Sequence, residues 1–409
     1  MRPYWLLTLL ATLAGAVNAA PMTFEAALKR ADLSAPILQA RAADVRAARS
    51  SAVAAGRLPD PKLVFGVEGY PVSGPNAGRP ERDDFSDAKI GVMQDFPNSA
   101  KRRSARDRAQ ADIGAAEATR SAQGREVRLN TALAWIDLFY ARRRLAALDE
   151  IEGALAPLRD AAASQVASGA QRPAQTLEPE QLTAALGDRR ADLVAAVARA
   201  RADLVRWTGD AEADIAGAPP AYDIDAAALH AGLDHLPALA VYDAMGRQAD
   251  ADVGAARAER RSDWGWELAY QRRDPRFGDM VMVQATVSLP LFASTRQNPV
   301  IAARVATAER VRIEREAARR ELLASLDAGL ADHAMHHDRL HRAQETLTPL
   351  AKRRADLETA GYAAGSASLS DVLQALLSLA EARVDTINRE ADVARDGARI
   401  VLTFGSQAQ

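Results

Sequence analysis

The feature that most constrains the fold is an internal repeat, because the chain aligns with itself at a shift of roughly 195 residues. The stretch "ASGAQRPAQTLEPEQLTAAL" from Ala167 matches "AAGSASLSDVLQALLSLA" from Ala363 without a gap, so that Gly169 falls on Gly365. Upstream, "DAKIGVMQDFPNSAKRR" matches "DMVMVQATVSLPLFASTR". Each half is therefore predicted to contain helix, strand, loop, strand, long helix, tip and return helix, in that order. The two halves are expected to span residues 21–215 and 216–409.

Each half carries two segments in which apolar and more polar residues alternate, which is the pattern of a two-faced β-strand. They predict hairpins at residues 62–96 and 264–290. One face is apolar and partly aromatic, and it is expected to carry Leu63, Phe65, Val67, Trp264, Trp266, Leu268 and Tyr270. The other face is polar and is expected to carry Glu68, Lys89, Glu267, Gln284 and Thr286.

A long helical segment follows each hairpin, predicted from about residue 99 to 167 and from about residue 298 to 362. At 1.5 Å per residue, roughly 65 residues make a rod on the order of 100 Å long. Apolar residues and histidines recur at steps of three and four, in Leu145, Leu148, Ile151, Leu155 and Leu158, and in Leu323, Leu326, Leu330, His333, His337 and Leu340. This spacing predicts coiled-coil seams with charged residues outside them.

The first 20 residues combine an early charge at Arg2, an apolar run and small residues before Pro21, which is the layout of a cleavable secretory signal. A retained membrane anchor is the alternative, but the apolar run is shorter than the roughly 20 residues that span a bilayer. Cysteine is absent, which excludes disulfides and thiolate metal sites. Basic and acidic residues are interleaved and leave a net charge of −2, so no nucleic-acid footprint is expected.

No later apolar run has the length of a membrane helix, so any membrane-spanning part would have to be built from strands. Four strands cannot close a barrel, and an open sheet edge cannot face lipid. Several chains would therefore share one barrel, with apolar side chains outward and polar side chains inward. The alternative is a small hairpin packed against the helices.

Three motifs together resemble the TolC-type outer-membrane efflux protein family. They are "LPDPKL" at Leu58–Leu63, "QDFPNSAKRR" at Gln94–Arg103 and "GYAAGSASLSDVLQA" at Gly361–Ala375, and the resemblance covers essentially the whole mature chain. It implies a mainly α fold with a membrane β-barrel: a homotrimer that shares a twelve-stranded barrel, with long coiled-coil helices forming a periplasmic α-barrel. The first two motifs further resemble the heavy-metal branch, which serves cobalt–zinc–cadmium or copper–silver pumps.

The resemblance also implies a function, partners and a location. The function is that of the outer-membrane channel of a tripartite efflux system in a Gram-negative bacterium. Its partners would be outer-membrane lipid, a periplasmic membrane-fusion adaptor and an inner-membrane RND-type pump. The competing functions are an exit duct for organic compounds or drugs and a soluble periplasmic coiled-coil adaptor. No constellation of nucleophile, acid and base is present, so neither enzyme activity nor a cofactor is expected.

A gate at the helix tip is implied as well. Asp371, just past Gly365, matches the position of an inward-facing carboxylate ring, which would attract cations on a narrow axis. Where the family often has a second Asp three residues on, this chain has Gln374, which leaves one ring where two are common. Gln175 and Glu178 occupy the equivalent places in the first half. The alternative is that Asp371 is a helix N-terminal acid favoured by the helix dipole.

The segment "HAMHHDRLH" places His333, His337 and His341 at i, i+4 and i+8. Two neighbours with this spacing could hold a divalent metal on one helix face. The alternative is that His333 and His337 are partly buried packing groups on the coiled-coil seam.

Overall fold

The computed structural model describes residues 21–167, 177–211 and 214–405. The expected signal peptide, as well as Gly169 and Gln175, lies outside these residues. Contacts group the chain into two compact units, and segments of both sequence halves contribute to each. The helical unit contains the described parts of Met1–Ala35, Arg125–Ala226 and Asp327–Gln409. The sheet unit contains Pro36–Gly124 and Ala227–Leu326.

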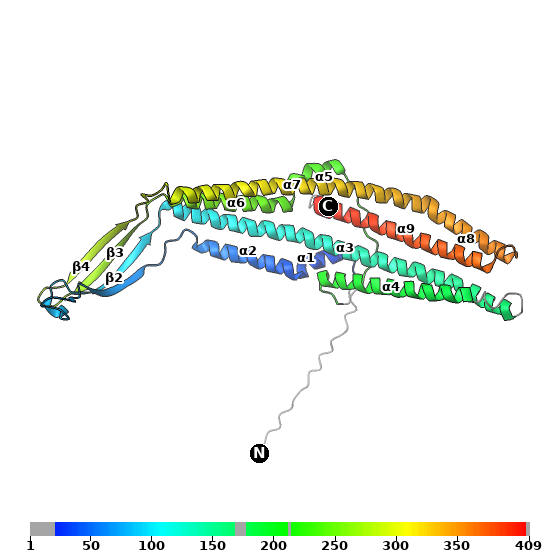
Figure 1. Cartoon of the computed structure of the whole chain (residues 1–409), viewed down its shortest axis with the longest axis horizontal. Coiled ribbons are helices and arrows are strands. Elements are labelled where there is room, and N and C mark those ends of the chain that lie inside the picture. Colours follow the sequence, from blue (N-terminus) through cyan, green and yellow to red (C-terminus); the bar gives the residue numbers. More distant parts are fainter. Residues whose placement is uncertain (1–20, 168–176, 212–213, 406–409) are drawn as a thin grey trace, which may run out of the picture. The chain divides into compact units, whose positions relative to one another are not determined.

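The sheet unit contains one four-stranded antiparallel sheet within the described residues (Figure 1). Its strands are β1 (Lys62–Glu68), β2 (Asp87–Phe96), β3 (Trp264–Arg272) and β4 (Met280–Val287), and they lie in this order. All four fall within the two segments that alternate in the sequence. The central pairing of β2 with β3 joins the two halves of the chain, with Phe96 opposite Trp264 and Ile90 opposite Tyr270.

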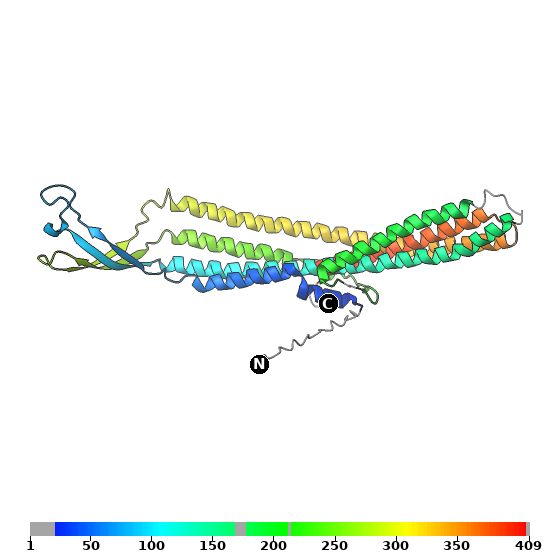
Figure 2. The same ribbon diagram turned by 90° about the horizontal axis from the view of Figure 1, so that it is seen from below.

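Four long helical segments and three short helices, the first at Pro80–Arg82, belong to the described part of the sheet unit. The long segments are α2 (Pro36–Ala54), the first part of α3 (Ser99–Ala167), α6 (Pro237–Ala258) and the first part of α7 (Gln297–Arg342), and Figure 2 shows α2 beside α3. The short helices α5 (Ala226–Gly232) and Leu233–His235 precede α6. Small apolar residues pack α6 against α7, including Val253 and Val311. Partly exposed ion pairs connect neighbouring helices, such as Arg315 with Asp243 at 2.6 Å; each contributes at most about 1 kcal/mol.

The helical unit is built from α1 (Phe24–Ser34), the rest of α3, α4 (Leu177–Thr208), the end of α7, α8 (Thr348–Ala363) and α9 (Leu369–Phe404). Its core centres on Trp135 of α3, which is fully buried. The Trp135 ring meets Phe24 edge-on at 5.5 Å, and its indole N–H donates to the carbonyl oxygen of Met22 at 3.1 Å. This contact fixes the start of α1 against α3.

A second cluster lies nearer the α8–α9 end of the unit and joins three helices. Leu148 and Ile151 of α3 pack with Leu186 of α4 and with Leu369 and Leu373 of α9. Two predicted seam positions of α3 are therefore buried as expected, while the side chains at 155 and 158 lie outside the described part. In both views α8 and α9 run side by side (Figures 1 and 2).

Two details of the α7 segment differ from the sequence prediction. The helix expected from about residue 298 to 362 is interrupted by one π-helical turn, Ala343–Leu347, before α8. His337, predicted on the buried seam, is exposed, and His336 takes the more buried position. The reason is that an α-helix has 3.6 residues per turn, so steps of three and four from His333 both return near one face.

Candidate functional site

One face of the sheet is mostly apolar, and the polar residues on it are Gln94, opposite Trp266, and Arg272, opposite Ala88. Paired residues of antiparallel strands point to the same side, so the register defines this face. It carries Leu63, Phe65, Val67, Ile90, Val92, Phe96, Trp264, Trp266, Leu268, Tyr270, Val281, Val283 and Val287. Most of these side chains are exposed in the single chain, with Phe65 at 76% and Val283 at 74%. A soluble monomer rarely exposes an apolar patch of this extent, so this face needs an apolar environment.

The opposite face carries the charges. Lys89 lies at its centre, and its Nζ is 2.7 Å from Glu267 and 3.0 Å from Glu68. Lys62 pairs with Asp95 at 2.7 Å. Asp87, Gln284 and Thr286 lie on the same face. Each residue that the sequence analysis assigned to the apolar or to the polar face lies on the predicted face. The polar face is suited to contact with water.

The sheet joins the helices through the motif "QDFPNSAKRR", and Asp263 is the centre of this junction. Asn98 donates to Asp263 Oδ1 from its backbone N–H at 2.8 Å and from its side-chain amide at 2.9 Å. Lys101 Nζ lies 2.6 Å from Asp263 Oδ2. Burial opposes ionisation of this carboxyl, but the hydrogen bonds from Lys101 and Asn98 outweigh it and lower the pKa of Asp263. The motif therefore ties the start of α3 to the residue that precedes β3.

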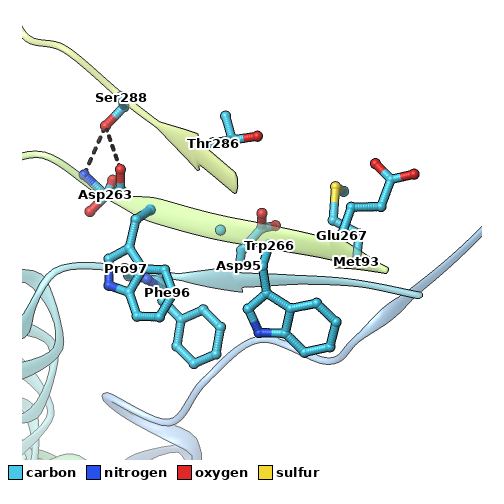
Figure 3. A pocket seen from close by; sticks show the side chains of 11 residues that line it. Met93, Asp95, Phe96, Pro97, Asp263, Trp266, Glu267, Thr286 and Ser288 are labelled. Atoms are coloured by element: carbon cyan, nitrogen blue, oxygen red, sulfur yellow. Dashed lines mark hydrogen bonds between the residues drawn. The ribbon is translucent and has the colours of Figure 1, made fainter. Parts of the chain in front are cut away.

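A pocket of about 360 Å³ lies at this end of the sheet (Figure 3). The rings of Phe96 and Trp264 stack at 4.3 Å on the apolar side. Figure 3 shows Trp266 on the same side as Phe96, whereas Glu267 and Thr286 point to the other side of the ribbon. The pocket is thus lined by residues of both faces, and its polar side chains do not point toward one common ligand position. Aromatic side chains at the end of a sheet are typical of a membrane–water interface.

The outer strands β1 and β4 have no neighbour on their outer edges within the described chain. Unpaired strand edges present rows of backbone N–H and C=O groups that can pair with another strand. Among the described helices, none combines the length and apolar character needed to cross a membrane.

At the tip of the helical unit, Asp371 lies in the first turn of α9 and closes a capping box with Ser368. The Ser368 hydroxyl accepts from the backbone N–H of Asp371 at 3.2 Å, while the Asp371 carboxylate accepts from the hydroxyl of Ser368 at 2.6 Å and from its backbone N–H at 3.0 Å. These hydrogen bonds, the side-chain one first, lower the pKa of the exposed carboxyl. The helix N-terminal role expected for Asp371 is therefore present, and its carboxylate is ionised at neutral pH.

The other predicted tip residues are only partly described. Gln374 is exposed on α9, one turn after Asp371. Gly365 has a positive φ of 77°, which glycine adopts without strain, and it lies in the turn between α8 and α9. Glu178 lies in α4, but its side chain is outside the described part, as is the whole of Gln175. The tip thus brings Asp371 and Gln374 onto one exposed face.

The histidine segment gives a different arrangement from the predicted one. His336 Nδ1 lies 2.6 Å from Asp396 of α9, a pair that the sequence prediction missed. The His333 and His337 rings are 6.4 Å apart, and His341 is exposed. Burial lowers the pKa of His333. No group of three or more His, Cys, Asp or Glu side chains suited to a metal ion occurs in the described part of the chain.

These features define the protein by its fold: long paired helices that carry one four-stranded, two-faced sheet. Solved membrane proteins share it. A membrane protein from Pseudomonas aeruginosa matches with a TM-score of 0.80 over 93% of both chains at 16% identity. The CmeC outer membrane channel of Campylobacter jejuni matches with a TM-score of 0.79 over 94% of this chain and 87% of that chain at 14% identity.

The outer membrane protein VceC of Vibrio cholerae matches with a TM-score of 0.77 over 94% of this chain and 97% of that chain, at 16% identity. Residues 228–406 match the profile of a family described as outer membrane efflux protein. No curated protein matches the sequence. This chain thus shares its fold with a protein described as an outer membrane channel.

Proposed function

We propose that this chain is, over its whole length, an outer membrane efflux protein that forms the outer-membrane channel of a tripartite efflux system. The observation that carries the proposal is the sheet: one face is mostly apolar, the other carries the paired charges, and neither outer edge has a neighbour among the described residues. Lipid would cover the apolar face and an aqueous channel would meet the charged face.

The free edges require neighbours, because unpaired backbone groups cannot face lipid. Pairing β4 of one copy with β1 of the next satisfies both edges and closes a barrel. Three copies give twelve strands, the number that the family resemblance implies. The homotrimer would then extend its helices into the periplasm, where a membrane-fusion adaptor and an inner-membrane RND-type pump would dock.

The proposed cargo is heavy-metal cations, with organic compounds or drugs as the competing cargo. The motifs "LPDPKL" and "QDFPNSAKRR" support the metal branch. The charged face of the sheet supports cations as well, because Glu68, Asp87, Asp95 and Glu267 outnumber Lys62 and Lys89. An excess of carboxylates along a pore raises the local concentration of cations.

The proposed gate lies at the tip. In a trimer, three copies of Asp371 would form a ring of carboxylates that are charged at neutral pH, with Gln374 one turn further along α9. Gln175 and Glu178 are the proposed first-half counterparts. Opening would move the tips apart, and the like charges of the ring would favour that movement unless a cation or a hydrogen-bond donor holds them.

Two experiments test the function and the cargo separately. Separation of inner and outer membranes by density, followed by amine-reactive crosslinking, is expected to give a three-chain product in the outer membrane; a soluble periplasmic monomer would refute the channel. Deletion of the gene is then expected to lower tolerance to cobalt, zinc, cadmium, copper or silver salts, with restoration by a plasmid copy. Lost tolerance to organic toxicants alone would assign the competing cargo.

A further inference from the structure

We propose that the outer surface of α8 packs antiparallel against α4 of a second copy of this chain, and that this contact closes the ring of copies. The inference rests on the proposed function, because it places several copies around one channel. It concerns two surfaces of the helical unit that the chain itself leaves uncovered.

Most exposed large apolar side chains in the described part of the helical unit lie on α4 or on the helix that runs from α7 into α8. Among the described residues of the unit, Leu33 of α1 is the exception; the others are Leu177 and Val194 on α4 and Met335, Leu347, Leu350 and Leu357 on α7 to α8. Leu350 and Leu357 are 57% and 66% exposed, although each lies on a packed helix. Leucines in such positions indicate a partner surface.

The π-helical turn Ala343–Leu347 explains why these leucines point outward. Ala343 is buried, and the next inward position is Thr348, whose hydroxyl lies 2.8 Å from that of Thr386 of α9. The two successive positions that face α9, Ala343 and Thr348, are thus five residues apart, whereas a spacing of three or four residues would continue an α-helical seam. Leu347 is therefore left on the outside, and the leucine spacing continues there.

The resulting α8 outer seam consists of Leu347, Leu350, Arg354 and Leu357, all exposed, with steps of three, four and three. The α4 outer seam consists of Leu177, Glu180, Ala184 and Gly187, also all exposed and also with steps of three, four and three. Each step pattern is that of the a and d positions of a coiled coil, the positions that face a partner helix.

The two seams are complementary when the helices run antiparallel. Leu347 then meets Gly187, Leu350 meets Ala184, Arg354 meets Glu180 and Leu357 meets Leu177. Large side chains oppose small ones, as knobs-into-holes packing requires, and the charged pair is of opposite sign. Neither Arg354 nor Glu180 forms a direct ion pair among the described residues, although the charge of Arg354 acts on the nearby carboxylate of Asp371. The matched length is about 15 Å.

The same register follows from the internal repeat. Leu357 lies eight residues before Gly365, and Leu177 lies eight residues after Gly169, the position that the repeat aligns with Gly365. The register that pairs Leu357 with Leu177 therefore also pairs positions at equal sequence distances from the two aligned glycines. The size pattern, the charge pattern and the repeat thus select one alignment.

Within one chain, α9 packs against both helices, so the seams are free for another copy. The α8–α9 contact covers the inner side of α8. On α4, Leu186 packs with Leu373 of α9, and Arg189 pairs with Glu381 of α9 at 2.9 Å. An α8 surface on one copy that meets an α4 surface on the next is a head-to-tail contact, and such a contact forms a ring when the rotation between copies closes after a whole number of copies.

Disulfide trapping tests the contact in a chain that has no cysteine of its own. Two differently tagged chains are co-expressed, one with Leu350→Cys and the other with Ala184→Cys, and intact cells are mildly oxidised. The expected result is a disulfide-linked product that carries both tags. Ala185→Cys in place of Ala184→Cys is the matched control: it is exposed and adjacent, but it is turned about 100° around α4. It should give at least about tenfold less product, because a disulfide needs Cα atoms within about 7 Å.

A charge exchange gives the second measurement. Arg354→Glu is expected to lower the yield of the amine-crosslinked trimer, and adding Glu180→Arg to the same chain is expected to restore it. A trimer in the outer membrane that gives no 350–184 product would refute this contact and leave the proposed function standing. A disulfide within one chain, or trapping of position 350 only by a different protein, would refute it as well. Absence of any trimer would refute the proposed function.

Discussion

Replacing Val283 by arginine should destabilise the membrane-embedded protein far more than the same replacement one residue on, at Gln284. Val283 lies in the middle of β4, in an apolar row that crosses the sheet through Leu268 and Val92 to Leu63. Gln284 lies on the charged face, directly opposite Glu267. The two substitutions therefore introduce the same side chain on opposite sides of one strand.

The size of the effect follows from the exposure of the two sites. Val283 is 74% exposed in the single chain, so an arginine fits without a steric clash and the cost comes from placing its charge in lipid. Arginine on the lipid face of a barrel costs about 2–4 kcal/mol near the bilayer midplane. That corresponds to a change of roughly 30- to 700-fold in the folding equilibrium. Gln284→Arg gains a cross-strand pair with Glu267 and should change stability by less than about 1 kcal/mol.

The assay is urea unfolding of the purified protein in lipid vesicles, followed by tryptophan fluorescence, to which Trp264 and Trp266 of the same sheet contribute. The Val283→Arg protein should unfold at a lower urea concentration, with a smaller share in the outer-membrane fraction of cells. Equal effects at positions 283 and 284, or a larger effect at 284, would refute the assignment of the apolar face to lipid.

Further predictions concern the helical unit. Ser368→Ala removes the cap of α9 and should cost about 1 kcal/mol in urea unfolding; no loss would argue against the capping box. Because hydrogen bonds lower the pKa of Asp371, its contribution is present above the ordinary carboxyl pKa of about 4 and is lost as the pH falls through the lowered value. Hydrogen exchange at the start of α9 should therefore accelerate only in acid. His336→Ala leaves Asp396, whose side chain is 12% exposed, without this partner and should cost about 1–3 kcal/mol, whereas exposed His341→Ala should cost less than about 0.5 kcal/mol. Zinc calorimetry should detect no binding above that of a His333→Ala, His337→Ala variant, and tight binding by the parent protein would contradict this.

Local periodicity predicted the elements well. The helix predicted from residue 99 to 167 is α3, and the strands fall in the alternating segments. Residues predicted to share a face do so, from Leu63 on β1 to Tyr270 on β3. These features depend on side-chain direction along one segment, and a period of two or 3.6 residues encodes that direction.

The candidate tip was predicted less completely. The resemblance pointed to Asp371, and the capping box with Ser368 could have been found from the Ser-x-x-Asp spacing before an apolar run. The pairing of His336 with Asp396 could not, because an acid 60 residues away on another helix leaves no local signal. The outward turn of Leu347 was also missed, since the heptad spacing itself is unbroken through the π-helical turn.

The sequence by itself determined that the chain forms long helices and short two-faced strands, and which side chains each strand turns to its apolar face. Only the tertiary structure decided that β2 pairs with β3, so that strands from the two halves form one sheet whose outer strands β1 and β4 have no further neighbour in the described part of the chain. The tertiary structure also decided that His336 contacts α9 and that Leu347, Leu350 and Leu357 are exposed. The physical reason is that side-chain direction is set by local geometry, whereas strand pairing and helix rotation depend on contacts between residues far apart in the chain, which no periodicity records.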